Sequence, residues 1–200
     1  MYTIEKAYDF DLAHRIDTQC LDEQFCDPGK KVAGRSLNRC LGLHGHGAVV
    51  KVKLASETLV DNMVLDYNEI GWMKKFIGQY LDHCTVIRTQ DELYKYLVKY
   101  PYNEVMGKQV ELIKSEDYST EDFSVYKLDL AGMPECGSLA GYLESVTVVD
   151  FVTASENFSK WIYQIVEKRV NEYNKAHGTA VKVVSCSYLE TATSEATYVG

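Results

Sequence analysis

The sequence lacks the features of a membrane protein and of an exported one. None of its apolar runs is long enough to cross a bilayer. The opening MYTIEKAYDFDLAH has neither the positive stretch nor the apolar stretch of a secretory signal. Internal repeats, heptad arrays and low-complexity tracts are also missing. We therefore expect an ordinary globular chain located in the cytoplasm.

An excess of positive charge is missing too. The formal net charge is −8 and the isoelectric point is about 5.1. Proteins that bind a phosphate backbone carry clustered Lys and Arg to displace counterions, so we expect no nucleic-acid partner. The six cysteines would suit a disulfide framework in a short secreted chain, but this chain is longer and lacks export signals. Reduced thiols are therefore expected.

Two stretches alternate between polar and apolar residues, as a strand with one buried face does. The first runs from Tyr2 to His14, and its apolar parity ends on His14. The second runs from His44 to Leu54, and its inward parity begins with His44 and His46 before continuing with Ala, Val, Val and Leu. A third, Val-rich stretch at 180–190 also predicts a strand.

Two other stretches have the apolar spacing of amphipathic helices. Asp66 and Glu69 have the spacing of a capping box ahead of the first. Thr153 and Glu156 repeat that spacing ahead of the second, which runs to Gly178 as a stop. Residues 85–150 between them are less clearly patterned, although VELI and SVYKLDL together suggest a hairpin. We predict an α+β protein forming a single domain over residues 1–200, with an insertion at about 85–150.

The histidines near the strand ends are candidate metal ligands. Residues two apart on a strand project from the same face, so His44 and His46 can chelate one ion, and His14 is the natural third ligand. Zinc accepts neutral imidazole nitrogen, and a catalytic zinc site typically has three protein ligands and an open fourth position. The alternative is that these are ordinary buried histidines, because a His-x-His motif is short.

Four further residues are candidates for chemistry or binding. Cys40 lies just before the histidine strand, where a nearby cation would favour the thiolate, a potential general base; otherwise it is a small buried side chain. Asp82 could orient the ring of His83 for proton transfer, although such a pair at a helix end is usually a surface feature. Glu190 could anchor a ligand with a donor-rich edge, or it could be a solvated strand end.

Six short motifs, in order, resemble the 6-pyruvoyltetrahydropterin synthase / 6-carboxytetrahydropterin synthase family. They are FDLAHR (10–15), CLGLHGH (40–46), MVLDYNEI (63–70), LDH (81–83), TASEN (153–157) and YLE (188–190). The resemblance implies a tunnelling fold, in which an antiparallel four-stranded sheet carries two helices on one face. It also implies a homo-oligomer whose sites lie between subunits.

The resemblance further implies roles for the candidate residues. The zinc ligands of the family fall on His14, His44 and His46. Its catalytic residues fall on Cys40, Asp82 and His83, and its pterin-anchoring glutamate falls on Glu190. A carboxylate suits that edge because it accepts two parallel hydrogen bonds. The implied cofactor is Zn²⁺, and the implied substrate is 7,8-dihydroneopterin triphosphate.

The spacing Cys-x-x-x-His-Gly-His is more like the bacterial 6-carboxytetrahydropterin branch, which feeds 7-deazaguanine (preQ0 and queuosine) synthesis. Two alternatives remain: elimination of triphosphate to give 6-pyruvoyltetrahydropterin, and a non-catalytic zinc- or pterin-binding module. Two features depart from the family. The stretch Val152–Ser155 replaces the usual Pro-Thr, and the segment after His83 is much longer than the short family connection.

Overall fold

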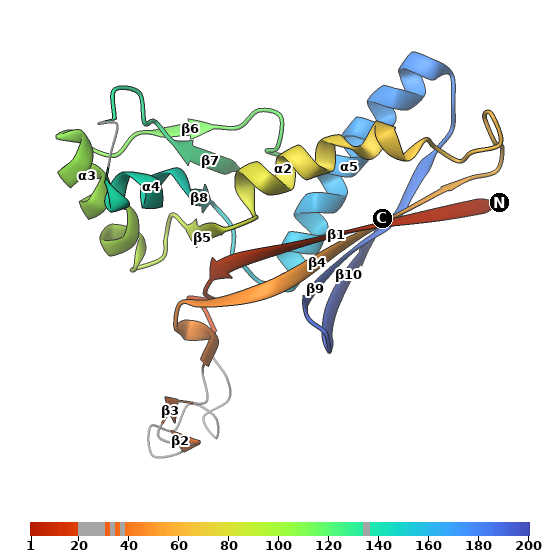
Figure 1. The fold of residues 1–200 in the computed structure, drawn as a ribbon. Coiled ribbons are helices and arrows are strands. Elements are labelled where there is room, and N and C mark those ends of the chain that lie inside the picture. The colour runs from red at the N-terminus through yellow and green to blue at the C-terminus, as the bar shows by residue number, and fades with distance from the viewer. Residues whose placement is uncertain (20–30, 33–34, 37–38, 134–136) are drawn as a thin grey trace.

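The computed structural model describes residues 1–19, 31–32, 35–36, 39–133 and 137–200. Its centre is an eight-stranded sheet. From one edge to the other the strands are β10 (Ser194–Val199), β9 (Lys182–Thr191), β4 (His44–Ser56), β1 (Tyr2–His14), β5 (Cys84–Arg88), β8 (Val146–Val149), β7 (Val125–Leu128) and β6 (Leu112–Lys114). A separate pair, β2 (Lys31–Val32) and β3 (Arg35–Ser36), lies below the sheet in Figure 1.

The strands β10, β9, β4 and β1 are antiparallel throughout and form the four-stranded sheet that the family resemblance implies. β5 then joins β1 in parallel, β8 joins β5 in parallel, and β7 and β6 complete the sheet as an antiparallel pair. The α+β tunnelling fold is thus confirmed, but the sheet has eight strands instead of four. Of the added strands, β5 and β8 were missed because they are short apolar runs buried on both faces, which show no alternation.

Two helices cover one face of the four-stranded half. α2 (Trp72–Tyr80) follows a 3₁₀ turn at Tyr67–Ile70, and α5 (Ser155–His177) is the longest helix described. Both contribute to the larger apolar core together with the inward residues of β1 and β4. The helices also touch each other, because the rings of Phe76 and Trp161 lie 5.2 Å apart edge to face.

The helix ends match the sequence in part. Asp66 caps the 3₁₀ turn, since its carboxylate accepts a 2.9 Å hydrogen bond from the Asn68 backbone N–H. Gly178 ends α5 with a left-handed φ of 65°, as predicted. The prediction that Thr153 caps α5 is wrong, because the N-cap is Ala154 and the Thr153 hydroxyl instead donates to the Arg15 carbonyl.

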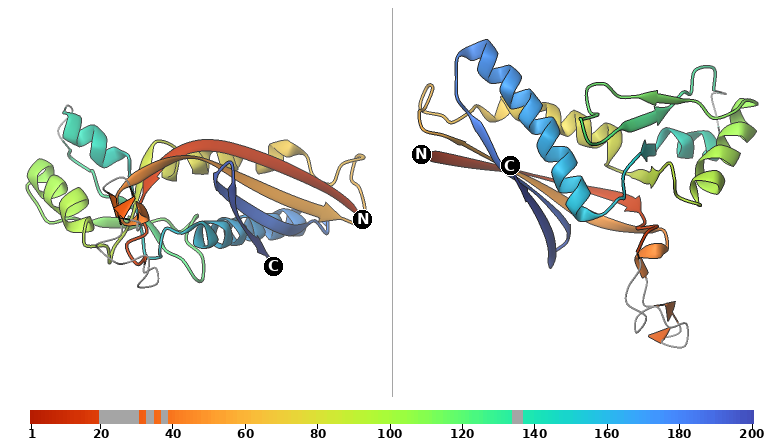
Figure 2. Two further views of the ribbon diagram at one scale, coloured as in Figure 1. Left: turned by 90° about the horizontal axis from the view of Figure 1, so that it is seen from below. Right: turned by 180° about the vertical axis from the view of Figure 1, so that it is seen from behind.

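Residues 84–149 extend the sheet sideways. The predicted hairpin is confirmed as β6 paired with β7. A π-helical segment (Lys95–Lys99), α3 (Tyr100–Met106) and α4 (Ser138–Glu144) pack at its far end, and the views of Figures 1 and 2 agree that they lie away from α5. This extension has a second apolar core of its own. That the chain is a single domain with this segment as an insertion stays a prediction.

No helix in the described ranges is long and apolar enough to cross a membrane.

Candidate metal centre

Four side chains with metal-binding atoms meet at one end of the four-stranded half. His14 is the last residue of β1, and His44, the first residue of β4, lies directly opposite it in the antiparallel register. His46 follows two positions along β4 on the same face, and Glu190 comes from the adjacent strand β9. The period of two along a strand therefore places both β4 histidines toward His14.

The three imidazole rings are close neighbours. Ring centroids lie 4.8 Å apart for His14 and His44, 4.8 Å for His44 and His46, and 5.3 Å for His14 and His46. One ligand atom from each histidine and one from Glu190 all lie within 4.8 Å of one another. The structure thus brings the three predicted ligands together, in a group that can hold a metal ion.

Hydrogen bonding orients two of the rings. Nδ1 of His14 lies 2.7 Å from the Thr153 carbonyl oxygen, and Nδ1 of His44 lies 2.7 Å from the Gly42 carbonyl oxygen. A carbonyl oxygen only accepts, so each Nδ1 carries the proton and each Nε2 presents a lone pair. Metal-bound histidines usually show this pattern, in which the second nitrogen donates to a carbonyl or carboxylate.

The Nε2 atoms of His14, His44 and His46 are buried, and apart from Glu190 Oε1, which lies near those of His14 and His46, they have no hydrogen-bond partner. A buried polar atom without a partner costs free energy, and native proteins contain few of them. Three such atoms pointing at one place are not explained by ordinary buried histidines, whose ring nitrogens would be paired. This donor set fits a divalent cation such as zinc.

Glu190 completes the group from the side of β9. Its Oε1 lies 3.0 Å from Nε2 of His14 and 3.3 Å from Nε2 of His46, while its Oε2 accepts a 3.0 Å hydrogen bond from the Ser155 hydroxyl. Without a metal, a hydrogen bond with the His14 ring holds the pKa of the Glu190 carboxyl at about 2, against the opposing effect of burial. Burial lowers the pKa of His46. An ionised carboxylate and a neutral imidazole are the forms that bind metals.

Aromatic packing holds the innermost ligand in place. The His14 side chain is 0 % exposed, and its ring lies 6.1 Å from that of Phe158 in the first turns of α5. Phe158 in turn stacks on Tyr188 at 4.9 Å, two residues before Glu190 in β9. Because packed interiors leave side chains little freedom, ligands on both strands are fixed by the same aromatic contacts.

A chain of polar contacts joins this centre to the extension. Thr153 takes part in two of these contacts. Its carbonyl accepts from His14, and its hydroxyl donates to the Arg15 carbonyl at 2.6 Å. The Arg15 guanidinium then pairs with Asp91 at 2.9 Å, and Asp91 is almost fully buried. A second pair, Arg88 with Asp17, lies beside it in sequence. These contacts fix the end of β1 that carries His14.

Cys40 lies in a 3₁₀ turn (Arg39–Leu41) immediately before β4. Its thiol is free and half-buried, and its carbonyl accepts a 2.7 Å hydrogen bond from the Ile16 backbone N–H. That bond ties the turn to the chain just beyond His14. Within the described residues, the sulfur is not among the ligand atoms of the four-residue group.

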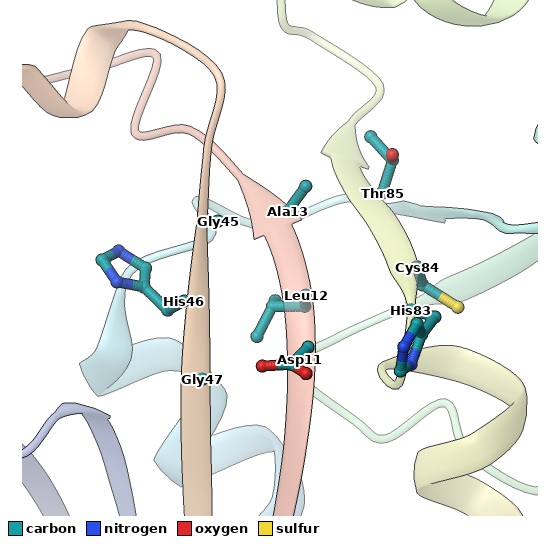
Figure 3. A pocket seen from close by; sticks show the side chains of 9 residues that line it. All are labelled: Asp11, Leu12, Ala13, Gly45, His46, Gly47, His83, Cys84 and Thr85. Carbon is teal, nitrogen blue, oxygen red and sulfur yellow. The ribbon is translucent and has the colours of Figure 1, made fainter.

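Asp82 and His83 lie elsewhere in the same chain. Oδ1 of Asp82 is 2.9 Å from Nδ1 of His83 and accepts the Asp11 backbone N–H at 3.2 Å. His83 has a left-handed φ of 55°, and its side chain is 80 % exposed. Figure 3 shows β4 and β1 lying between the rings of His46 and His83. This pair is therefore not brought to the histidine cluster of its own chain.

A cavity of about 440 Å³ lies along β1, between β4 and β5 (Figure 3). Gly45 and Gly47 line it from β4 without side chains, together with His46, while Asp11 lines it from β1 and His83 from the turn before β5. Because these glycines have the opposite parity from His44 and His46, the cavity opens on the sheet face that the helices leave uncovered.

Sequence reasoning missed two residues of this site. Thr153 orients His14 through its carbonyl, and Ser155 holds Glu190 through its hydroxyl. The motif TASEN contains both, but its spacing suggested a capping box. Their real partners are more than 30 residues away in sequence, so no local pattern reveals them.

Comparisons with known proteins show which family the chain resembles. A family model described as 6-pyruvoyl tetrahydropterin synthase matches residues 3–200. A 6-carboxy-5,6,7,8-tetrahydropterin synthase from Aquifex aeolicus is 26 % identical over 98 % of this chain and 97 % of its own length.

Solved structures show the same fold. An uncharacterized protein from Wolinella succinogenes is 29 % identical, with 100 % of this chain and 98 % of that chain covered and a TM-score of 0.78. A Plasmodium vivax 6-pyruvoyltetrahydropterin synthase is 16 % identical, with 99 % and 98 % covered and a TM-score of 0.50. The family model covers nearly the whole chain, and the chain therefore belongs to the 6-pyruvoyl tetrahydropterin synthase family.

Proposed function

We propose that this protein is a zinc-dependent 6-carboxytetrahydropterin synthase. Its substrate is 7,8-dihydroneopterin triphosphate, its pathway is 7-deazaguanine (preQ0 and queuosine) biosynthesis, and its location is the cytoplasm. The observation that carries the proposal is the convergence of three buried imidazole nitrogens on one place in a member of a pterin synthase family. The name of the Aquifex aeolicus relative and the short Cys-x-x-x-His-Gly-His spacing favour the carboxy product.

The cluster would hold the cation on His14, His44 and His46. A zinc ion bound there supplies Lewis-acid polarisation of the hydroxyls on the substrate side chain, which acidifies the adjacent carbons. Neutral imidazoles leave the cation its full charge, and the carbonyls of Thr153 and Gly42 keep those rings oriented. Three protein ligands leave room for the substrate oxygens.

Cys40 is the proposed general base, because its turn leads directly into the histidine strand. A thiolate close to a cation is favoured over the thiol and can remove a proton from carbon. Glu190 is the proposed pterin anchor. Its carboxylate can accept paired hydrogen bonds from an amino group and a ring N–H.

Asp82 and His83 are proposed to complete the site of a neighbouring subunit. In one chain, β1 and β4 separate this pair from the histidine cluster, and His83 is exposed at the uncovered sheet face. In a homo-oligomer that packs this face against a second copy, His83 would reach the substrate bound at the metal site of that second copy. Asp82, hydrogen-bonded to Nδ1, would then orient the ring for proton transfer.

The test is to incubate the zinc-loaded protein with 7,8-dihydroneopterin triphosphate and identify the pterin formed. The proposal predicts 6-carboxytetrahydropterin with release of triphosphate and a two-carbon fragment. Formation of 6-pyruvoyltetrahydropterin would establish the alternative chemistry of the same site. Tight pterin binding with no conversion would instead support a non-catalytic module.

The role of Cys40 is tested separately. Cys40→Ala should retain one zinc per chain and lose turnover by roughly 10²- to 10⁴-fold, the usual contribution of a general base. Cys186→Ala is the matched control, because Cys186 is a free buried thiol outside the ligand group, and it should retain both metal and turnover. Undiminished turnover in Cys40→Ala would remove the proposed base.

A further inference from the structure

One carboxylate oxygen of Glu190 lies where a fourth ligand of the proposed metal site would be. Glu190 Oε1 lies 3.0 Å from Nε2 of His14 and 3.3 Å from Nε2 of His46, and beyond these contacts the three buried atoms have no hydrogen-bond partner. When the ring is neutral, its one proton is on Nδ1 and is donated to the Thr153 carbonyl, so Nε2 has only a lone pair to offer. Two acceptors therefore face each other at contact distance.

Such a pair is repulsive unless a cation lies between the atoms. Protonation of His14 would supply one, but it would leave the unpartnered Nε2 atoms of His44 and His46 unexplained. A metal ion accounts for all four atoms at once, since Oε1 lies within 4.8 Å of every imidazole ligand atom. Four ligands of the types His₃Glu make a closed set for zinc.

We propose that Glu190 is a fourth, displaceable metal ligand when no substrate is bound. The inference rests on the proposed metal site but not on which pterin is made. Ser155 holds the other carboxylate oxygen, Oε2, from the first residue of α5, so one carboxylate oxygen is fixed while the other is free to change partner. When a pterin presents its donors, Glu190 turns to them and leaves the fourth position to the substrate hydroxyls.

This arrangement gives one residue two consecutive roles. In the resting state the carboxylate satisfies the cation and keeps water from the fourth position. In the substrate complex it holds the pterin, so metal access and ring recognition are coupled through a single side chain. The coupling follows from geometry, because Oε1 of the partly buried Glu190 faces His14 while Oε2 is held by the Ser155 hydroxyl.

The test is a zinc affinity measured by chelator competition on substrate-free protein. Glu190→Gln keeps the size of the side chain but removes its charge, and it should weaken zinc binding by about 10- to 100-fold, the range seen when metal-site partners are lost. Ser155→Ala should weaken binding in the same direction by at most about tenfold. Glu195→Gln on β10 is the matched control, since it removes the same charge from an exposed strand position, and it should bind zinc as the parent chain does.

Equal zinc affinity in Glu190→Gln, Glu195→Gln and the parent chain would overturn the proposal, because Glu190 would then make no contribution in the resting state. Cobalt substitution gives a second measurement. The visible spectrum of the Co²⁺ form should differ between the parent chain and Glu190→Gln, and an unchanged spectrum would also count against the fourth ligand. Failure to make 6-carboxytetrahydropterin would affect neither result, so the two proposals fail separately.

Discussion

The two halves of the sheet bury their strands in different ways. In β1 only alternate residues are buried, and exposed carboxylates such as Asp9 and Asp11 occupy the opposite face. In β5 and β8 both faces are buried: Val86 packs into the larger core and Ile87 into the smaller one. The ligand-bearing half therefore has one exposed sheet face that a partner or substrate can reach. In the extension, both faces of β5 and β8 are covered.

The comparison also assigns different tasks to the halves. The four-stranded half supplies every atom of the candidate metal group, and the extension supplies none. The extension nevertheless contributes Asp91, whose pair with Arg15 lies at the end of the contacts that orient His14. Four experiments, ordered by the size of the effect that we expect, test this division.

Loss of a ligand should have the largest effect. His46→Ala is expected to lower zinc affinity by at least about 100-fold, because even indirect partners of a metal cost about 10- to 100-fold. Elemental analysis after gel filtration measures the zinc retained per chain. His177→Ala is the control, since that histidine is exposed at the end of α5, and it should retain the metal. Full zinc retention by His46→Ala would contradict the proposed site.

Breaking the buried Arg15–Asp91 pair should have the next largest effect. Asp91→Asn leaves the Arg15 charge buried without a counter-charge, which typically costs about 3–5 kcal/mol of stability. The amide oxygen can still accept the Leu93 backbone N–H, so the local turn survives. Urea unfolding measures the loss, and chelator competition should show weaker zinc binding in the same variant.

The control for that variant is Asp122→Asn, which breaks an exposed pair with Lys160 and should cost much less. A large loss of stability with unchanged zinc affinity would show that the extension supports the fold but not the metal site.

Equal truncations in the two cores test whether the halves fold together. Leu54→Ala in the larger core and Leu143→Ala in the smaller one should each cost about 2–5 kcal/mol. Because β5 and β8 contribute to both cores, we expect each variant to shift one common unfolding transition. Two separate transitions, of which Leu143→Ala shifts only one, would instead indicate two domains.

Lys127 should give the smallest effect, visible as a pH dependence. Burial lowers the pKa of this lysine, which donates to the Val146 carbonyl and the Thr147 hydroxyl in the extension. The unfolded chain, with a lysine pKa near about 10.4, then binds more protons than the folded one, so this group adds stability as pH rises toward that value.

The free energy of unfolding of the parent chain minus that of Lys127→Met should therefore increase between about pH 8 and pH 10. Burial raises the pKa of Cys84 and Lys127 lowers it, so removing Lys127 raises that pKa further and adds to the same increase in the difference. A difference that stays constant with pH would mean that the folded lysine is as readily protonated as the unfolded one.

The sequence predicted the ligand-bearing half well because its information is local. The period of two put His44 and His46 on the inward face, and the same period put His14 at the end of an inward parity. The structure adds the antiparallel register between β1 and β4, which places His14 directly opposite His44. Glu190 was also found, although as a substrate anchor and not as a member of the ligand group.

The extension could not be predicted in the same way. β5 and β8 carry four consecutive buried residues each, and such runs do not reveal a face or a neighbour. The pairing of Arg15 with Asp91 and the use of the Thr153 carbonyl depend on contacts between distant segments. These polar contacts are set by the assembled fold, so only the structure shows them.

The most direct test of the metal site is X-ray absorption at the zinc edge of the loaded, substrate-free protein. The account predicts a shell of nitrogen and oxygen ligands near about 2.0–2.1 Å with imidazole scattering, and no sulfur. A sulfur ligand at about 2.3 Å would contradict it, because a cysteine thiolate would then hold the cation in place of the proposed imidazole and carboxylate ligands.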